Sequence, residues 1–203
     1  MVEGGADLHP LEPSRGLGAF AEPGAGAWRC AAQPGVSGRH QYPRPRQGGG
    51  GTKKGEPAAA RDRREALGRS RGGYGTKACV IADAAGRALG FVLAPGQAHE
   101  LPWAPALLAL LAFVPLWISG DRGYAARVFR ALIRQLGSHP AIPAKRNETG
   151  VDCPPWIYIH RNRVERLWGR LKEWRAVATR YEKTAQSFIG VLCLAATMDW
   201  LKA

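Results

Sequence analysis

The pattern of apolar and polar positions divides the chain into two parts near residue 61. Before that point no period of 2 or 3.6 residues is sustained, and 17 of the 26 glycines fall before residue 77. The run RPRQGGGG at 44–51 has no apolar side chain to contribute to a core. We therefore predict that residues 1–60 are low-complexity and disordered, and that residues 61–203 form the folded domain.

Strand-like and helix-like segments alternate from residue 74 onward. Two apolar segments are joined by Asp83–Gly86, which has Asp at the first turn position and Gly at the fourth, so a β-hairpin is expected. The predicted strands cover 77–82, 89–93, 116–118 and 141–143, and the predicted helices cover 106–113, 125–136, 159–174 and 184–201. This order predicts an α/β fold with a mixed sheet flanked by helices.

Two further patterns indicate which parts of the chain are buried in the core. The segment 101–119 carries no charge, but its prolines at 102, 105 and 115 interrupt it, which favours buried core over a membrane helix. The helix at 125–136 has a predicted apolar stripe of Val128, Leu132, Ile133 and Leu136, with Arg127, Arg130 and Arg134 elsewhere on its surface.

Charge and cysteine content narrow the class of protein. Lys and Arg number 29 against 16 Asp and Glu, a net charge of +13, which favours a polyanionic partner and excludes an acidic solvating protein. The four cysteines contain no C-x-x-C pair, so we expect reduced thiols, no cysteine metal site and a cytoplasmic location. The N-terminus also lacks the pattern of a signal peptide.

The predicted helix at 159–174 carries the most specific pattern in the chain. Polar and aromatic residues recur at steps of three and four along one face: Tyr158, Arg161, Glu165, Trp168 and Lys172. A neighbouring stripe of Val164, Leu167, Leu171 and Trp174 is expected to pack. One interpretation is a solvated helix in which Arg161 and Glu165 form an ion pair. The other is a metal-binding carboxylate surrounded by cations that contact phosphate.

Asp121 provides a second candidate carboxylate. It follows the short strand predicted at 116–118 and precedes Arg122-Gly123-Tyr124, and the carboxyl ends of strands are where α/β sheets bind ligands. A turn or helix-cap role explains an Asp at this place equally well. Phosphoryl transfer on DNA needs two Mg²⁺ ions held by oxygen ligands from separate elements, and a strand-end Asp with a helix-borne Glu meets that need.

Taken together, these motifs resemble the DDE transposases of bacterial insertion sequences, which have a ribonuclease H-like catalytic fold. Tyr158, Arg161, Glu165 and Lys172 match the spacing of that family's helix signature, and Asp121–Tyr124 resembles its second-aspartate motif. Three further segments are similar to family motifs, and the resemblance covers residues 66–202. These segments are 68–77, 95–99 and 174–184.

The resemblance implies DNA strand cleavage and transfer by two-metal phosphoryl transfer. Asp121 and Glu165 would be catalytic residues and ligands of Mg²⁺ or Mn²⁺. The residues implied in DNA binding are Tyr158, Arg161, Arg163, Arg166, Arg170, Lys172 and Arg175. The implied partner is double-stranded DNA at transposon ends, bound by a single copy or a homodimer, in the nucleoid and not at a membrane.

The chain departs from the family at the first aspartate, which normally lies on the first, central strand. No Asp occurs between Asp7 and Asp62, and Asp83 is explained by its turn. We therefore expect the first strand, which should fall within 28–50, to be damaged or missing. The domain would then be incomplete, its two-carboxylate site would hold metal weakly, and cleavage would be impaired, as in a truncated or frame-slipped transposase remnant.

Two rival classes stay open on sequence grounds. A non-catalytic basic nucleic-acid-binding remnant would account for the charge and would need no metal. A different ribonuclease H-like nuclease would cleave generic substrates and not particular inverted repeats.

Overall fold

The computed structural model describes residues 29–33, 41–43, 55–71 and 73–202. Its longest strands are β4 (Gly73–Ala82) and β5 (Ala88–Pro95), which pair antiparallel as the predicted hairpin. The turn between them is held by Asp83, whose Oδ1 accepts hydrogen bonds from the backbone N–H groups of Ala85 and Arg87, both at 2.9 Å. The predicted turn role of Asp83 is confirmed.

Seven strands form one mixed sheet in the described part of the chain. Its central path runs β4, β1 (Arg29–Gln33), β6 (Trp117–Ser119) and β7 (His139–Ala141), and β1–β6 and β6–β7 pair in parallel. Two short strands, β2 (Gln41–Pro43) and β3 (Gly68–Ser70), pair antiparallel with β4. The mixed α/β class predicted from the sequence is confirmed.

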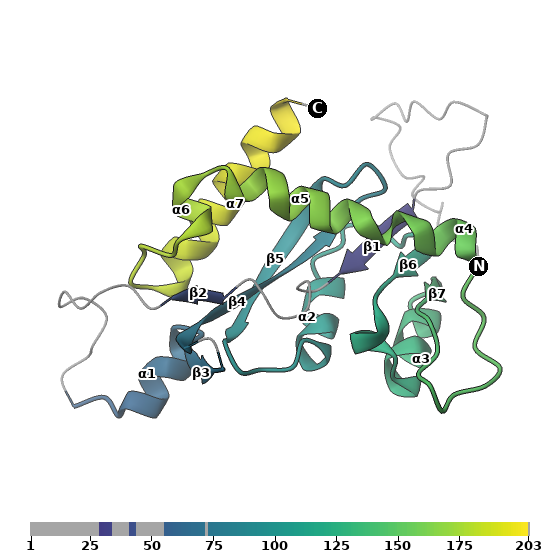
Figure 1. Cartoon of the computed structure of the whole chain (residues 1–203), viewed down its shortest axis with the longest axis horizontal. Coiled ribbons are helices and arrows are strands. Elements are labelled where there is room, and N and C mark those ends of the chain that lie inside the picture. The colour runs from purple at the N-terminus through teal and green to yellow at the C-terminus, as the bar shows by residue number, and fades with distance from the viewer. Residues whose placement is uncertain (1–28, 34–40, 44–54, 72, 203) are drawn as a thin grey trace, which may run out of the picture.

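The side chains of β4 alternate between two cores because successive residues of a strand point to opposite faces. Ala78, Val80 and Ala82 belong to one cluster, and Cys79 and Ile81 belong to the other. The first cluster is covered by α5 (Asn162–Lys172) and α7 (Ala185–Leu201), and the second by α2 (Ala104–Leu108) and α3 (Arg127–Gln135). The sheet therefore lies between two helical layers (Figure 1).

The remaining helical segments are short. They are α1 (Ala58–Arg64), η1 (Leu101–Trp103), η2 (Arg122–Tyr124), α4 (Pro155–Tyr158), η3 (Ile159–Arg161) and α6 (Arg175–Ala178). The helix predicted at 159–174 thus consists of η3 followed by α5, and α4 precedes it, so a tighter 3₁₀ turn lies before Glu165. The last helix is capped by Thr184, whose Oγ1 accepts from the Ser187 N–H at 3.1 Å.

The prediction that the first strand is damaged or missing is wrong as regards the strand itself. Segment β1 pairs with β4 through Ala31–Gln33 and with β6 through Arg29–Ala31, so it takes a central position in the sheet. Backbone hydrogen bonding to two neighbours forms this strand although its sequence, RCAAQ, has weak strand propensity. The expectation that this strand lacks the family's first aspartate is confirmed, because none of its five residues is acidic.

The predicted division at residue 61 stays a prediction. Most of residues 1–60, including the Gly-rich run at 44–51, lie outside the described residues. Within that range the structure describes β1, β2 and the start of α1.

The stripe predicted for the helix at 125–136 is wrong at two of its four positions. Val128 is 82% exposed and Leu136 is 41% exposed, whereas Phe129 and Arg130 are buried beside Ile133. Arg130 is buried because it has partners distant in sequence: its Nη1 and Nη2 contact the Glu148 carboxylate at 3.1 Å, and Nη2 also donates to the Pro143 carbonyl at 3.0 Å. These bonds hold the segment after β7 against α3.

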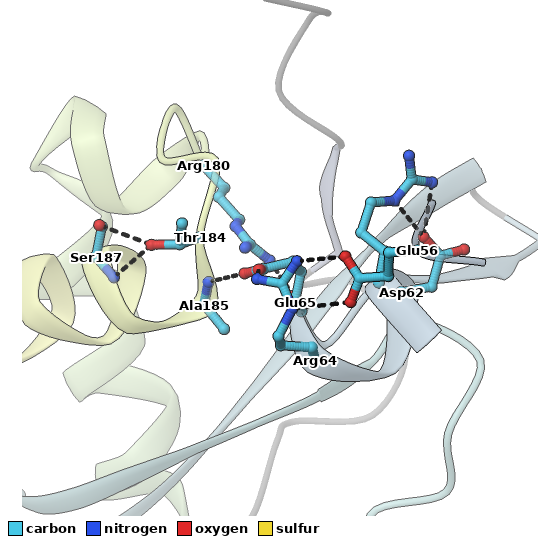
Figure 2. A network of polar contacts seen from close by, with 9 residues as sticks. Glu56, Asp62, Arg64, Glu65, Arg180, Thr184, Ala185 and Ser187 are labelled. Carbon is cyan, nitrogen blue, oxygen red and sulfur yellow. Dashed lines mark hydrogen bonds and ion pairs between the residues drawn. The ribbon is translucent and has the colours of Figure 1, made fainter. Parts of the chain in front are cut away.

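A second buried arginine ties the C-terminal helices to the sheet (Figure 2). Arg180, 1% exposed, donates to the Glu65 carbonyl at 3.0 Å and to the Thr76 hydroxyl. The Glu65 carboxylate, also buried, accepts from the Ala185 N–H at 2.7 Å and pairs with Arg64. We call Glu65, Thr76, Arg180 and Ala185 the Arg180 network. It joins residues more than 100 positions apart and fastens the start of α7 to the end of α1 and to β4.

Candidate active site

A cavity of about 570 Å³ opens where β6 and β7 end. Because these strands are parallel, the residues that follow them emerge at the same edge of the sheet. The residues that line the cavity come from four separate segments: Glu100, Asp121, Arg122, Gly123, Tyr124, Pro143, Tyr158 and Arg161. Acidic, basic and phenolic groups thus share one opening.

Asp121 enters this cavity from the end of β6. Its Oδ1 accepts a hydrogen bond from the Gly123 N–H at 2.8 Å, so it caps the 3₁₀ turn η2, as the turn interpretation predicted. Burial raises the pKa of the Asp121 carboxyl above its ordinary value of 3.8. The Gly123 N–H opposes that rise in pKa, the negative charge of Glu100 adds to it, and the positive charge of Arg161 opposes it.

Glu100 is a cavity residue that the sequence motifs did not single out. It follows β5 and precedes η1, and its Oε1 lies 2.8 Å from Lys77 Nζ. Lys77 also donates to the Ala98 carbonyl at 2.7 Å, so the pair fixes the segment after β5 to β4. Its position directly after the motif at 95–99 is the sequence feature that could have identified Glu100 as a site residue.

Tyr158 of α4 and Arg161 of η3 also line the cavity. The Arg161 guanidinium carbon lies 5.4 Å from the centre of the Tyr158 ring. Arg161 Nη1 is also 3.7 Å from Glu165 Oε1, and both side chains are more than two-fifths exposed. The i,i+4 ion pair expected for a solvated helix is therefore confirmed. Arg161 lines the cavity together with Asp121 and contacts Glu165, whereas Glu165 is not among the residues that line the cavity.

The other predicted DNA-binding residues differ in their exposure and in their protein partners. Arg166 and Arg175 are exposed, while Arg163 and Lys172 are half-buried, and burial lowers the pKa of Lys172. Arg170 already has two protein partners: its Nε lies 2.7 Å from Asp199 Oδ1, and Nη2 donates to the Gly86 carbonyl at 2.8 Å. Arg170 therefore joins α5 to α7 and to the β4–β5 turn.

The apolar stripe of the helix follows the prediction closely. Val164, Leu167 and Leu171 are fully buried, while Trp174 is 36% exposed. Trp168, placed by its spacing on the polar face, is buried and lies with its ring centre 6.1 Å from that of Phe91. The polar face is thus narrower than the sequence pattern predicted, and it begins at Tyr158 and Arg161.

The donor set fits a weakly held hard cation better than a closed metal cage. No group of three His, Cys, Asp or Glu side chains is arranged to hold a metal ion among the described residues. Mg²⁺ is usually bound by one or two carboxylates together with water and substrate phosphates. The carboxylates of Asp121 and Glu100 in one open cavity meet this requirement.

Comparison with known proteins defines the class of protein. Two family models match the chain, both described as "Transposase DDE domain", one over residues 45–150 and the other over 118–202. The chain therefore belongs to the DDE transposase domain family.

A particular relative supports the same assignment. The chain is 33% identical over 129 residues to a Brucella ovis protein named as a "transposase for insertion sequence element IS6501". The match covers 63% of this chain and 98% of that relative. No solved structure matches the chain. Among the described residues, no helix has the length and apolar character required to cross a bilayer.

Proposed function

We propose that this chain is a ribonuclease H-like DDE transposase domain that binds DNA ends and divalent cations and has impaired strand-cleavage activity. The observation that carries the proposal is the cavity at the end of β6. There Asp121 shares one opening with Tyr158 and Arg161, and Arg161 contacts Glu165 in the next helical turn. The family match supports a role for these residues in DNA cleavage during transposition.

The order of strands supports the ribonuclease H-like part of the proposal. An antiparallel hairpin, β4–β5, is followed across the sheet by β1 and then by two parallel strands, β6 and β7. In this arrangement β1 lies between the strand that leads to Asp121 and β4. It also lies against η3 and α5, which carry Arg161 and Glu165.

The proposal gives each polar residue a role. Asp121 and Glu165 would bind Mg²⁺ or Mn²⁺, which when bound activates the attacking oxygen and stabilises charge on the phosphate. Arg161, held over the Tyr158 ring, would release Glu165 and bind a DNA phosphate beside the cations. Arg166 and Arg175, which are exposed, together with Arg163 and Lys172, would contact the DNA backbone further along the helix.

Impairment follows from the composition of β1. The central strand is where this family carries its first aspartate, and the five residues of β1 contain no carboxylate. One oxygen ligand is therefore missing, and we expect weak metal binding and little strand cleavage.

The second candidate is a non-catalytic basic DNA-binding protein. Two observations favour it: the net charge of +13, and the Arg161–Glu165 ion pair, which satisfies both groups without metal. This candidate predicts DNA binding that does not depend on divalent cations.

The experiment that separates the two measures DNA binding by the full chain with Mg²⁺, with Mn²⁺ and with EDTA. We expect divalent cations to strengthen binding about tenfold, equivalent to about 1.4 kcal/mol, and we expect Asp121→Asn and Glu165→Gln to lose this gain. Glu173→Gln is the control, since Glu173 is exposed at the far end of α5.

Two outcomes would contradict the proposal. Binding that is the same in EDTA and in Mn²⁺ would support the non-catalytic alternative. Efficient Mg²⁺-dependent nicking of supercoiled DNA that Glu165→Gln abolishes would show that the activity is not impaired.

A further inference from the structure

We infer that Glu100 is a further carboxylate ligand of the divalent-cation site at Asp121, supplied by the segment that follows β5. The inference rests on the proposed function, since it concerns the same cavity. It adds a ligand from an element that the sequence motifs did not assign to the site.

The first argument is position. Glu100 and Asp121 line the same cavity although they belong to separate segments, which follow β5 and β6. Two oxygen donors from separate elements at one opening are the arrangement in which Mg²⁺ and Mn²⁺ are held beside a substrate phosphate.

The second argument is charge. Two carboxylates that line one cavity repel each other. A divalent cation bound in this cavity would offset the repulsion. Arg161 also lines the cavity and supplies an opposing positive charge, but its Nη1 lies 3.7 Å from Glu165 Oε1.

The third argument concerns Lys77. Its Nζ contacts Glu100 Oε1 at 2.8 Å and the Ala98 carbonyl at 2.7 Å, so it holds the glutamate in place. A carboxylate has two oxygens and about four acceptor sites, so this contact leaves capacity for a metal ligand. Lys77 therefore positions Glu100 and at the same time weakens its attraction for a cation.

The fourth argument is the missing ligand on β1. β1 offers no acidic residue, and Glu165 is not among the residues that line the cavity. Glu100 is the acidic residue that lines the cavity beside Asp121.

The test is a titration of the full, DNA-free chain with Mn²⁺, followed by electron paramagnetic resonance of the free ion. Glu100→Gln keeps the size of the side chain and an oxygen acceptor for Lys77, and we expect it to weaken Mn²⁺ binding about tenfold. Asp121→Asn should weaken binding at least as much, and Glu173→Gln should leave it unchanged. Thermal unfolding of each variant checks that it is folded.

Lys77→Met sharpens the test by a double-mutant cycle. Removing the competing ammonium should tighten Mn²⁺ binding severalfold when Glu100 is present, and should have no effect in the Glu100→Gln background. A purely structural Lys77–Glu100 pair predicts that neither substitution changes Mn²⁺ affinity.

The outcomes separate the inference from the proposed function. If Asp121→Asn loses Mn²⁺ binding while Glu100→Gln retains it within twofold, the inference is wrong and the proposed function stands. If the unaltered chain binds no Mn²⁺, or binds it equally well after Asp121→Asn, then the metal site of the proposed function is wrong as well.

Discussion

The Asp121 cavity and the Arg180 network both bring together charged residues from distant parts of the chain. The two regions differ in how far these charges are buried and hydrogen-bonded. In the network, Arg180 and Glu65 are almost fully buried and form hydrogen bonds to Thr76, Ala185 and backbone carbonyls, while Arg180 Nη2 has no hydrogen-bond partner among the described residues. Figure 2 shows part of this network. In the cavity, Asp121 and Glu100 share an opening, and burial, together with the negative charge of Glu100, raises the pKa of Asp121.

The difference separates charges that stabilise the fold from charges that are available to bind a ligand. Buried charges that bond mainly to other groups of the protein hold α1, β4 and α7 together. Like charges facing an open cavity reduce stability, and a cation would relieve that cost. Four substitution experiments test this contrast, beginning with the largest expected effect.

The largest effect is expected from Arg180→Met. The change removes hydrogen bonds to the Glu65 carbonyl, the Thr76 hydroxyl and the Glu182 carbonyl, and leaves buried polar groups without partners. We expect the free energy of unfolding to fall by about 3 kcal/mol, as measured by urea denaturation. Arg166→Met, on the exposed face of α5, is the control and should change it by less than about 0.5 kcal/mol. Equal effects would contradict the structural role of Arg180.

The next effect tests the missing carboxylate of β1 with the pair Ala31→Asp and Ala32→Asp. Successive strand residues point to opposite faces of a sheet, so only one of the two substitutions can supply an oxygen ligand near Asp121. We expect one variant to bind Mn²⁺ about tenfold more tightly, a gain of about 1.4 kcal/mol, and to cleave DNA more efficiently. If neither does so in folded protein, the attribution of impaired cleavage to β1 fails.

The third effect concerns the basic face of α5. Arg166 is exposed, whereas Arg170 is bound to Asp199 and Gly86. If Arg166 neutralises one phosphate, Arg166→Ala should reduce the slope of log affinity against log salt by about 0.9, as measured by fluorescence anisotropy with duplex DNA. Arg170→Ala should change this slope less and reduce stability more. The reverse ranking would show that Arg170 leaves Asp199 to bind DNA.

The smallest effect is expected for the stability of Asp121→Asn without divalent cations. Because its pKa is raised in the folded state, ionisation of Asp121 destabilises the fold as pH rises above the carboxyl range. Asparagine does not ionise, and its side-chain oxygen can still accept from the Gly123 N–H. We expect its melting temperature at pH 7 to exceed that of the unaltered chain by about 1–2 °C. The difference should shrink as pH falls below 3.8, and a gain that does not depend on pH would contradict this explanation.

Local patterns predicted the hairpin, the turn at Asp83 and the positions of the later helices. The signature residues Tyr158, Arg161 and Glu165 also lie as their spacing indicated, on the turns around the start of α5. These features depend on contacts between residues close in sequence, which periodicity and turn chemistry record.

The features that sequence reasoning missed depend on distant partners. Arg130 is buried in α3 because Glu148 and Pro143 reach it from the segment after β7. Strand β1 forms because β4 and β6 flank it, and Glu100 becomes a cavity residue because the segment after β5 reaches the opening that Asp121 also lines. No local sequence pattern predicts these three features, because each depends on contacts that form only when the sheet assembles.

The central claim is that Asp121 and Glu165 share a divalent-cation site, and it is tested most directly by diffraction from crystals of the chain bound to a short DNA duplex and soaked in Mn²⁺. We expect an anomalous peak in the cavity at the end of β6, coordinated by the Asp121 carboxylate, with the Glu165 carboxylate turned from Arg161 towards the same site. A cavity without Mn²⁺, or Mn²⁺ bound at Glu165 on a separate surface, would contradict the account.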